Sequence, residues 1–176
     1  MFNIALIGAG RIGQVHAANI ASHPETTLSA VVDPFDGNAH LICEQYGATR
    51  QTVEEVLQDE SIDAVCICSA TDTHANLIEL AALAGKAIFC EKPIDLELSR
   101  VRDCLAVVDR QEVPFLVGFN RRYDPQFCQL KNKLEQGVIG VPATLTITSR
   151  DPEPPHADYV KVSGGMFRDM TIHDLF

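Results

Sequence analysis

The stretch that decides the fold of this chain is Gly8-Ala9-Gly10-Arg11-Ile12-Gly13, a G-x-G-x-x-G sequence. It follows a short apolar run, Phe2–Ile7, and opens a segment with helical spacing, Ile12–His23. An acidic residue, Asp33, ends the next apolar run about 20 residues after the last glycine, which is the spacing of a dinucleotide-binding turn. We therefore predict that Gly8 permits a tight turn, Gly10 lets a pyrophosphate approach the backbone, and Gly13 lets helix and strand pack closely.

Strand-like and helix-like segments alternate from this turn as far as residue 117. Alternation of this kind gives a parallel sheet with helices on both faces. We therefore predict an α/β fold, a doubly wound parallel sheet of the Rossmann type. The expected strands are Phe2–Ile7, Leu28–Val32, Ala64–Cys68, Ala87–Cys90 and Phe115–Val117, and the expected helices are Ile12–His23, Asn38–Tyr46, Val53–Gln58, Thr73–Leu83 and Leu98–Arg110.

After Asn120 the pattern changes. Asp124–Leu134 has helical spacing, and Ala143–Ser149 alternates apolar residues with threonines, which predicts a half-exposed strand. One strand with one face to bury does not make a stable sheet by itself. We therefore expect residues 1–120 to form an NAD-binding domain and residues 121–176 to be the incomplete start of an α+β second domain, in a chain that is part of a longer protein.

The charge of the chain indicates which partners it disfavours. The formal net charge is −10, and all of it lies in residues 1–120. An acidic chain without a cluster of basic residues is not expected to bind nucleic acid. It does not argue against a dinucleotide, because backbone N–H groups can hold a pyrophosphate.

The six cysteines form no C-x-x-C pair and no His/Cys cluster with zinc spacing, so we expect no metal site. Several lie in apolar runs, where a free cysteine packs as a small hydrophobe. We expect buried, reduced thiols and a cytoplasmic protein. The chain shows no basic leader and no apolar stretch of ~18 residues, so we expect neither export nor membrane insertion.

Asp33 is the residue that indicates whether the chain prefers NAD or NADP. Its carboxylate is expected to accept hydrogen bonds from the adenosine ribose hydroxyls and to repel a 2′-phosphate. The following residues, Pro34-Phe35-Asp36, offer no arginine or lysine to receive that phosphate. The sequence therefore favours NAD over NADP, although Asp33 taken alone could also be a solvated acid at a strand end.

Three further residues are candidates for chemistry. Lys92 follows a predicted strand, and ligands of open parallel sheets bind at the carboxyl ends of strands. Asp169 and His173 stand at i and i+4, so on a helix they share a face and could act as an acid/base pair. Taken one at a time, each is compatible with an ordinary surface residue.

Together these features resemble the glucose–fructose oxidoreductase/inositol dehydrogenase/rhizopine catabolism (Gfo/Idh/MocA) family. The resemblance covers essentially the whole chain, and its last two motifs are most like the myo-inositol 2-dehydrogenase branch. The motifs are a dinucleotide loop at Ala9–His16, a loop bordering the nicotinamide at Ser69–His74, the hallmark tripeptide Glu91-Lys92-Pro93, a crossover at Gly118–Asp124, and the segments Ser149–Pro152 and Ser163–Asp174.

The resemblance implies a role for each matching residue. Lys92, Asp169 and His173 match the family's catalytic lysine, aspartate and histidine, and a cis peptide bond is implied before Pro93. The glycine turn and the acidic residue that follows the next strand give the expected cofactor contacts Gly8, Gly10, Arg11, Ile12, Gly13 and Asp33. The resemblance adds Ser69, Thr71, His74, Glu91, Lys92 and Arg121.

The activity that this resemblance implies is NAD-dependent oxidation of a ring hydroxyl of an inositol, or of a related polyol or sugar, to a ketone. In this scheme His173 removes the hydroxyl proton, Lys92 hydrogen-bonds the oxygen, and Asp169 orients His173 or the substrate. The full-length protein is expected to form a homo-oligomer through its second domain. Two alternatives stay open: another sugar or sugar acid as substrate, and a non-catalytic NAD-binding or redox-sensing module.

Overall fold

The computed structural model describes residues 1–150 and 153–175. The chain forms two compact units, Met1–Gly118 and Phe119–Phe176. Among the helices of the described residues, none combines the length and the apolar character that crossing a membrane requires.

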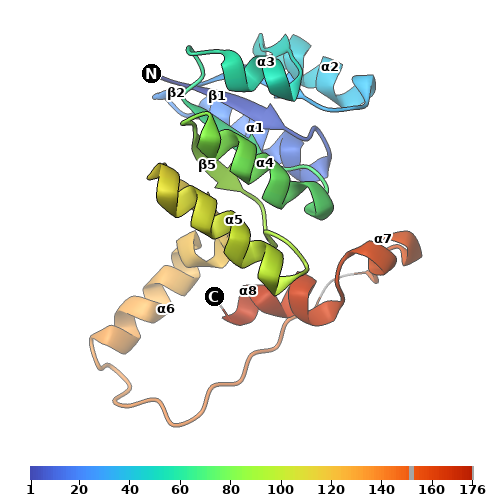
Figure 1. Ribbon diagram of the computed structural model, residues 1–176. Coiled ribbons are helices and arrows are strands. Elements are labelled where there is room, and N and C mark those ends of the chain that lie inside the picture. The colour runs from blue at the N-terminus through green and yellow to red at the C-terminus, as the bar shows by residue number, and fades with distance from the viewer. Residues whose placement is uncertain (151–152, 176) are drawn as a thin grey trace. The chain divides into compact units, whose positions relative to one another are not determined.

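The first unit is built on a six-stranded parallel sheet with the strand order β3-β2-β1-β4-β5-β6. Figure 1 labels β1, β2 and β5 of this sheet. From β1 the chain runs outward through β2 and β3, then returns to β4 on the other side of β1 and continues to β5 and β6. The reversal creates a topological switch point between β1 and β4. The strands are β1 Phe2–Ile7, β2 Thr26–Val32, β3 Thr49–Arg50, β4 Ala64–Ile67, β5 Ala87–Cys90 and β6 Phe115–Val117.

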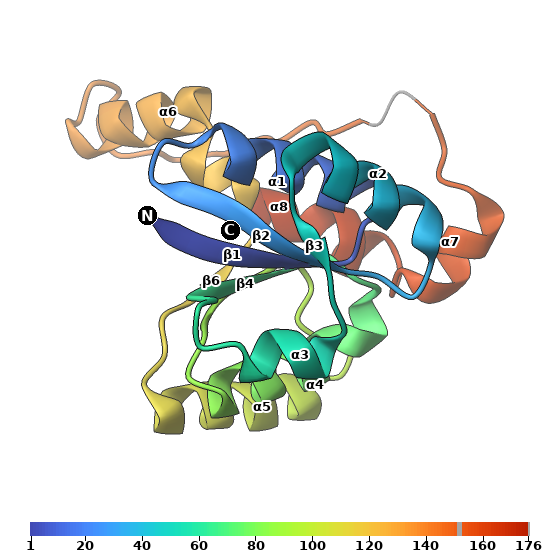
Figure 2. The same cartoon turned by 90° about the horizontal axis from the view of Figure 1, so that it is seen from above.

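Helices cover both faces of this sheet. Figure 2 shows α1 and α2 on one face and α3, α4 and α5 on the other. The predicted doubly wound Rossmann sheet is therefore confirmed. The helices are α1 Arg11–Ser22, α2 Asp36–Tyr46, α3 Val53–Gln58, α4 Thr71–Leu83 and α5 Leu98–Gln111.

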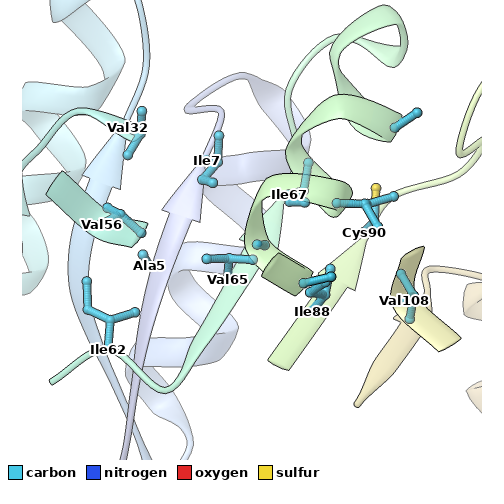
Figure 3. Packing of buried hydrophobic residues seen from close by; sticks show 14 of the residues in the cluster. Ala5, Ile7, Val32, Val56, Ile62, Val65, Ile67, Ile88, Cys90 and Val108 are labelled. Carbon is cyan, nitrogen blue, oxygen red and sulfur yellow. The ribbon is translucent and has the colours of Figure 1, made fainter. Parts of the chain in front are cut away.

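The central strands contribute apolar side chains to both layers. On β1, Leu6 belongs to the cluster under α1 and α2, whereas Ala5 and Ile7 belong to the cluster under α3, α4 and α5. Figure 3 shows this second cluster, in which Val65 and Ile67 of β4 lie beside Ala5 and Ile7 of β1. Successive side chains of a strand point to opposite faces, so a strand covered on both faces is apolar at almost every position.

Local capping explains where two of the helices begin and end. α2 stops at Gly47, whose left-handed backbone (φ 71°) lets its N–H donate to the carbonyl of Cys43. α3 begins at Thr52, where the hydroxyl accepts from the N–H of Glu55 and the Glu55 carboxylate accepts from the N–H of Thr52. This capping box satisfies two helix-terminal donors at once.

The ten strands and helices predicted in the first unit are all present, with ends within about two residues of those expected. The sequence prediction missed β3, Thr49–Arg50. Two residues are too few to carry a periodic pattern, and this strand exists because it pairs with Ala30 and Val31 of β2.

The described residues of the second unit are helical or irregular. They contain the 3₁₀ helix η1 Asn120–Tyr123, α6 Pro125–Glu135, α7 Ala157–Val162, the π-helix η2 Phe167–Thr171 and α8 Ile172–Leu175. The predicted helix Asp124–Leu134 is confirmed as α6. Asp124 is its N-cap, and its carboxylate accepts from the backbone N–H groups of Gln126 and Phe127 at 2.8 and 3.2 Å.

The strand predicted at Ala143–Ser149 is wrong. These residues lie outside any helix or strand, and all are exposed. A strand is stabilised by backbone hydrogen bonds to a neighbouring strand, and the described part of this unit contains none. The alternation of apolar residues and threonines does not create a strand without such a neighbour.

Candidate functional site

Loops that follow four strands of the first unit meet at one edge of the sheet, beside the switch point between β1 and β4. The N–H of Gly8 donates to Val32 at 2.8 Å, and the N–H of Cys68 donates to Ile7 at 2.7 Å. The N–H of Glu91 donates to Ile67 at 2.9 Å. These bonds fasten the carboxyl ends of the strands to one another, and ligands of open α/β sheets bind outside that edge.

The three glycines of the turn have different surroundings. Gly8 has φ +102°, and a Cβ there would lie 2.5 Å from the backbone of Cys68 and Ser69. A Cβ on Gly13 would overlap the carbonyl oxygen of Gly8. The tight turn at Gly8 and the close helix–strand packing at Gly13 are therefore confirmed. A Cβ on Gly10 would meet nothing within 4 Å, so the space above Gly10 is open to a ligand.

The N-terminus of α1 lies at the same place. Gly10 is the N-cap and no side chain caps the helix, whose first bond runs from the N–H of Gln14 to the carbonyl of Gly10 at 3.0 Å. The N–H groups of Arg11, Ile12 and Gly13 have no acceptor within the helix. Such N–H groups, with the positive end of the helix dipole, bind an anion such as a pyrophosphate. The open space at Gly10 and these donors fit a dinucleotide.

Asp33 has a role within the protein that the sequence did not reveal. One carboxylate oxygen accepts from the N–H of Ala9 at 2.6 Å, and the other accepts from the N–H of Phe35 at 2.8 Å. The side chain thus ties the end of β2 to the glycine turn after β1. A carboxylate has about four lone-pair positions, so Asp33 keeps acceptor capacity for ribose hydroxyls.

A cation lies next to Asp33 that the sequence reasoning missed. Nη2 of Arg50 lies 2.5 Å from the carbonyl oxygen of Asp33 and 3.1 Å from a carboxylate oxygen of Asp36. Residues 34–36 contain no cation, but pairing of β3 with β2 brings Arg50 to Asp33 from farther along the chain. An arginine between the predicted helices Asn38–Tyr46 and Val53–Gln58 was the available signal.

The loop after β5 contains the Glu91-Lys92-Pro93 motif, and the Lys92–Pro93 peptide bond is cis, as the resemblance implied. Oε1 of Glu91 lies 2.8 Å from Nε2 of His16, whose ring contacts Phe89. Burial by itself would raise the pKa of Glu91, but the hydrogen bond and charge of His16 and the backbone N–H of Lys92 bring the pKa below its ordinary value. His16 therefore joins α1 to this loop, a contact that only the fold reveals.

His74 connects the same loop to the one after β4. It is 1% exposed, its Nδ1 lies 2.8 Å from the carbonyl oxygen of Pro93, and its Nε2 lies 3.0 Å from that of Ser69. The hydroxyls of Ser69 and Thr73 lie 2.6 Å apart, and Thr71 begins α4. The structure therefore brings Ser69, His74 and the Pro93 loop together, with His74 inside the protein.

In the second unit, the candidate residues form contacts of their own. Arg121 pairs with Asp174, donates to the hydroxyl of Ser149 at 3.2 Å and stacks over the ring of Phe127. Asp169 lies in the π-helix η2, and the hydroxyl of Tyr159 donates to its Oδ1 at 2.8 Å. Tyr159 was not among the predicted site residues.

His173 follows in α8, so Asp169 and His173 both lie in a helical segment, as their pairing at i and i+4 assumed. It begins as a wider π-turn instead of a regular α-helix. Single π-turns occur frequently at functional sites.

Comparisons with known proteins agree with these observations. The profile of the oxidoreductase family GFO_IDH_MocA, described as an NAD-binding Rossmann fold, matches residues 2–119. Inositol 2-dehydrogenase of Rhizobium meliloti (strain 1021) is 53% identical over 169 residues, which are 96% of this chain and 51% of that protein.

Two solved structures are also similar. Myo-inositol dehydrogenase from Corynebacterium glutamicum ATCC 13032 has a TM-score of 0.93 and 45% identity, over 99% of this chain and 53% of that one. Scyllo-inositol dehydrogenase from Lactobacillus casei, with bound NAD(H) and scyllo-inositol, has a TM-score of 0.86 and 32% identity, over 99% of this chain and 54% of that one.

The chain therefore spans about half the length of the relatives that it matches. Its resemblance to the Gfo/Idh/MocA family, first indicated by the motifs, is confirmed by the family profile. The chain belongs to the GFO_IDH_MocA oxidoreductase family, and its first unit is that family's NAD-binding Rossmann fold.

Proposed function

We propose that this chain is the cofactor-binding part of an NAD-dependent dehydrogenase that oxidises a ring hydroxyl of an inositol to a ketone. The observation that carries the proposal is the open space above Gly10, at an uncapped helix N-terminus and beside Asp33. The inositol dehydrogenases among its relatives support the substrate class.

We assign the cofactor contacts to the edge of the sheet where the loops meet. The N–H groups after Gly10 hold the pyrophosphate, and the Asp33 carboxylate accepts from the adenosine ribose. The nicotinamide end lies toward the loops of Ser69, Thr71 and Glu91, with His74 supporting these loops from inside. Residues 1–120 make up this domain, and residues 121–176 begin the substrate domain.

The proposed chemistry removes a proton and a hydride from one carbinol group. NAD, when bound, accepts the hydride at its nicotinamide ring. His173 takes the hydroxyl proton, and Lys92 donates a hydrogen bond to the oxygen on which negative charge develops. Asp169, which accepts from Tyr159, orients His173 or the substrate.

The wider setting follows from the same residues. We propose a cytoplasmic enzyme, because the described cysteines are free thiols. Its acidic charge disfavours nucleic acid as a partner. We propose that the full-length protein forms a homo-oligomer through its second domain, where Leu145 and Ile147 are exposed.

Two measurements test the function. Calorimetry with NADH should show saturable binding to this chain, and its absence at millimolar NADH would remove the cofactor assignment. The complete gene product should then reduce NAD with myo-inositol or scyllo-inositol in preference to glucose. Activity only with another sugar would correct the substrate class, and NADH binding without activity on any polyol would favour a non-catalytic module.

A further inference from the structure

Arg50 lies at the part of the proposed cofactor site where NAD and NADP differ. Its guanidinium donates to the carbonyl oxygens of Asp33 and Phe35, at 2.5 and 3.5 Å. The carboxylate of Asp33 accepts from Phe35 at the same turn. The cation is therefore held against the backbone of the residues that flank the expected ribose position.

One carboxylate pairs with this cation, and a second belongs to Asp33, whose backbone carbonyl accepts from the cation. Asp33 places its negative charge where the ribose hydroxyls are expected, and Asp36 forms an ion pair with Arg50 at 3.1 Å. The Asp36 side chain is 97% exposed and that of Arg50 is 35% exposed. Such a pair is weak, because Asp36 is almost fully exposed and gains little by leaving water for the guanidinium. A stronger anion can therefore replace Asp36 at Arg50.

A phosphate is such an anion. The planar guanidinium of arginine presents several N–H donors that match phosphate oxygens in pairs, and these charge-assisted bonds are stronger than neutral ones. In dinucleotide-binding sheets that take NADP, a nearby arginine accommodates the 2′-phosphate. Arg50 has the chemistry and the position for that contact.

We infer that Arg50 is a latent 2′-phosphate ligand: this site prefers NAD because Asp36 pairs with the cation and the Asp33 carboxylate repels the phosphate, and not because the site lacks a cation. The inference rests on the proposed NAD site. It makes Arg50 a specificity-determining residue and requires no new arginine after β2.

The test is a double-mutant comparison on this chain, with NADH and NADPH affinities measured from the change in nicotinamide fluorescence on binding. D33S removes the charge that repels the 2′-phosphate. We expect its NADPH affinity to rise by about tenfold or more, since hydrogen bonds to charged groups are each worth that much. D33S/R50Q should lose this gain, and D33S/D36N should increase it, because Arg50 is then free of Asp36.

A matched control separates the position of the charge from its amount. D33S/R102Q removes one positive charge from the exposed surface of α5 and should keep the NADPH affinity of D33S. Because Asp33 also holds Ala9 and Phe35, D33N provides a second route that retains one oxygen acceptor. Thermal unfolding of each variant shows that the affinities belong to folded protein.

The outcomes are distinct. An NADPH gain in D33S or D33N that survives R50Q, or no gain in variants that still bind NADH, would overturn the role of Arg50 and leave the proposed function intact. A wild-type chain that binds neither dinucleotide would overturn the proposed function, and the inference with it. A gain that disappears with R50Q but not with R102Q would establish the inference.

Discussion

Each glycine of the turn is required for a different reason, and this difference can be measured. Gly13 lies inside α1, where alanine is normally more favourable by about 1 kcal/mol. Here its Cβ would overlap the carbonyl of Gly8. Gly10 has the opposite setting, since a Cβ there contacts no protein atom within 4 Å. One substitution should therefore affect folding, and the other should affect ligand binding.

We expect Gly13→Ala to lower the free energy of unfolding by about 1–3 kcal/mol, the usual cost of forcing extra atoms into a packed site. Gly10→Ala should leave the stability within about 0.5 kcal/mol and weaken NADH by about tenfold or more, because the methyl group occupies the space of the pyrophosphate. Urea denaturation and NADH titration of both variants check this. Equal stability of Gly13→Ala and wild type would contradict the packing argument.

The contact between Glu91 and His16 predicts a pH dependence of stability. The pKa of Glu91 in the folded chain lies below the ordinary 4.5. Its ionised form therefore stabilises the fold at pH values above 4.5, and this contribution is lost as the pH falls through the depressed pKa. Glu91→Gln removes the contribution at every pH.

The difference in unfolding free energy between wild type and Glu91→Gln should therefore be largest near neutral pH and should shrink as the solution is acidified below 4.5. Urea denaturation over the acidic range measures it. Glu25→Gln, on the exposed surface, is the matched control and should show little difference at any pH. A gap that is independent of pH would mean that Glu91 acts through its shape and not its charge.

At the scale of elements, His74 of α4 holds two loops that carry candidate site residues. Its ring meets the carbonyl oxygens of Ser69 and Pro93 in the interior. Without the ring, these oxygens lose their partner, and an unsatisfied buried polar group costs about 1–3 kcal/mol.

We therefore expect His74→Ala to lower the free energy of unfolding by about 2–5 kcal/mol, from two carbonyls and a small cavity. Hydrogen exchange should become faster in the loops after β4 and β5. His40→Ala, on the exposed face of α2, should change stability by less than about 0.5 kcal/mol. A loss at His74 no larger than at His40 would show that water replaces the ring at both carbonyls.

The elements also show what the sequence could and could not predict. Segments such as Ala87–Cys90 were found because burial on both faces leaves an apolar run that is visible in the sequence. The strand predicted at Ala143–Ser149 is wrong, because alternation of apolar and polar residues indicates which face would be apolar but not whether a neighbouring strand exists.

The missed site residues have a common cause. Arg50 reaches Asp33 through the pairing of β3 with β2, and His16 reaches Glu91 across the sheet edge. Tyr159 reaches Asp169 from another helix of the second unit. A sequence motif consists of residues close together in the chain, whereas these contacts join segments that are farther apart in sequence. The glycine turn was predictable because its function depends on consecutive backbone positions.

For the whole molecule, charge and binding are compatible. The net charge of −10 lies entirely in the part that we assign to an anionic dinucleotide. Backbone N–H groups and a helix N-terminus carry no net charge and are unaffected by the protonation of side chains, so they bind a pyrophosphate in an acidic domain. The acidic surface then weakens non-specific binding of nucleic acids and other polyanions.

The two units are proposed to have different roles, and substitutions can separate these roles. The cofactor contacts that we propose lie almost entirely in the first unit, whereas His173 lies in the second. A base that removes the substrate proton acts in the transition state and adds little to the affinity for the cofactor. In the complete gene product, His173→Gln should therefore lower kcat by about 10²–10⁴-fold, the usual contribution of a general base, and leave the NADH affinity within about threefold.

Lys92→Ala should lower kcat to a similar degree, since loss of one donor to a developing oxyanion typically costs about 2.7–4 kcal/mol. Steady-state kinetics with an inositol, together with NADH titration of the same variants, separate the two effects. Arg102→Gln, on the surface of α5, should leave both quantities unchanged.

If His173→Gln kept wild-type kcat, another group would have to take the proton. If it lost NADH binding instead, His173 would belong to the cofactor site, and the proposed separation between a binding unit and a proton-transfer unit would be wrong.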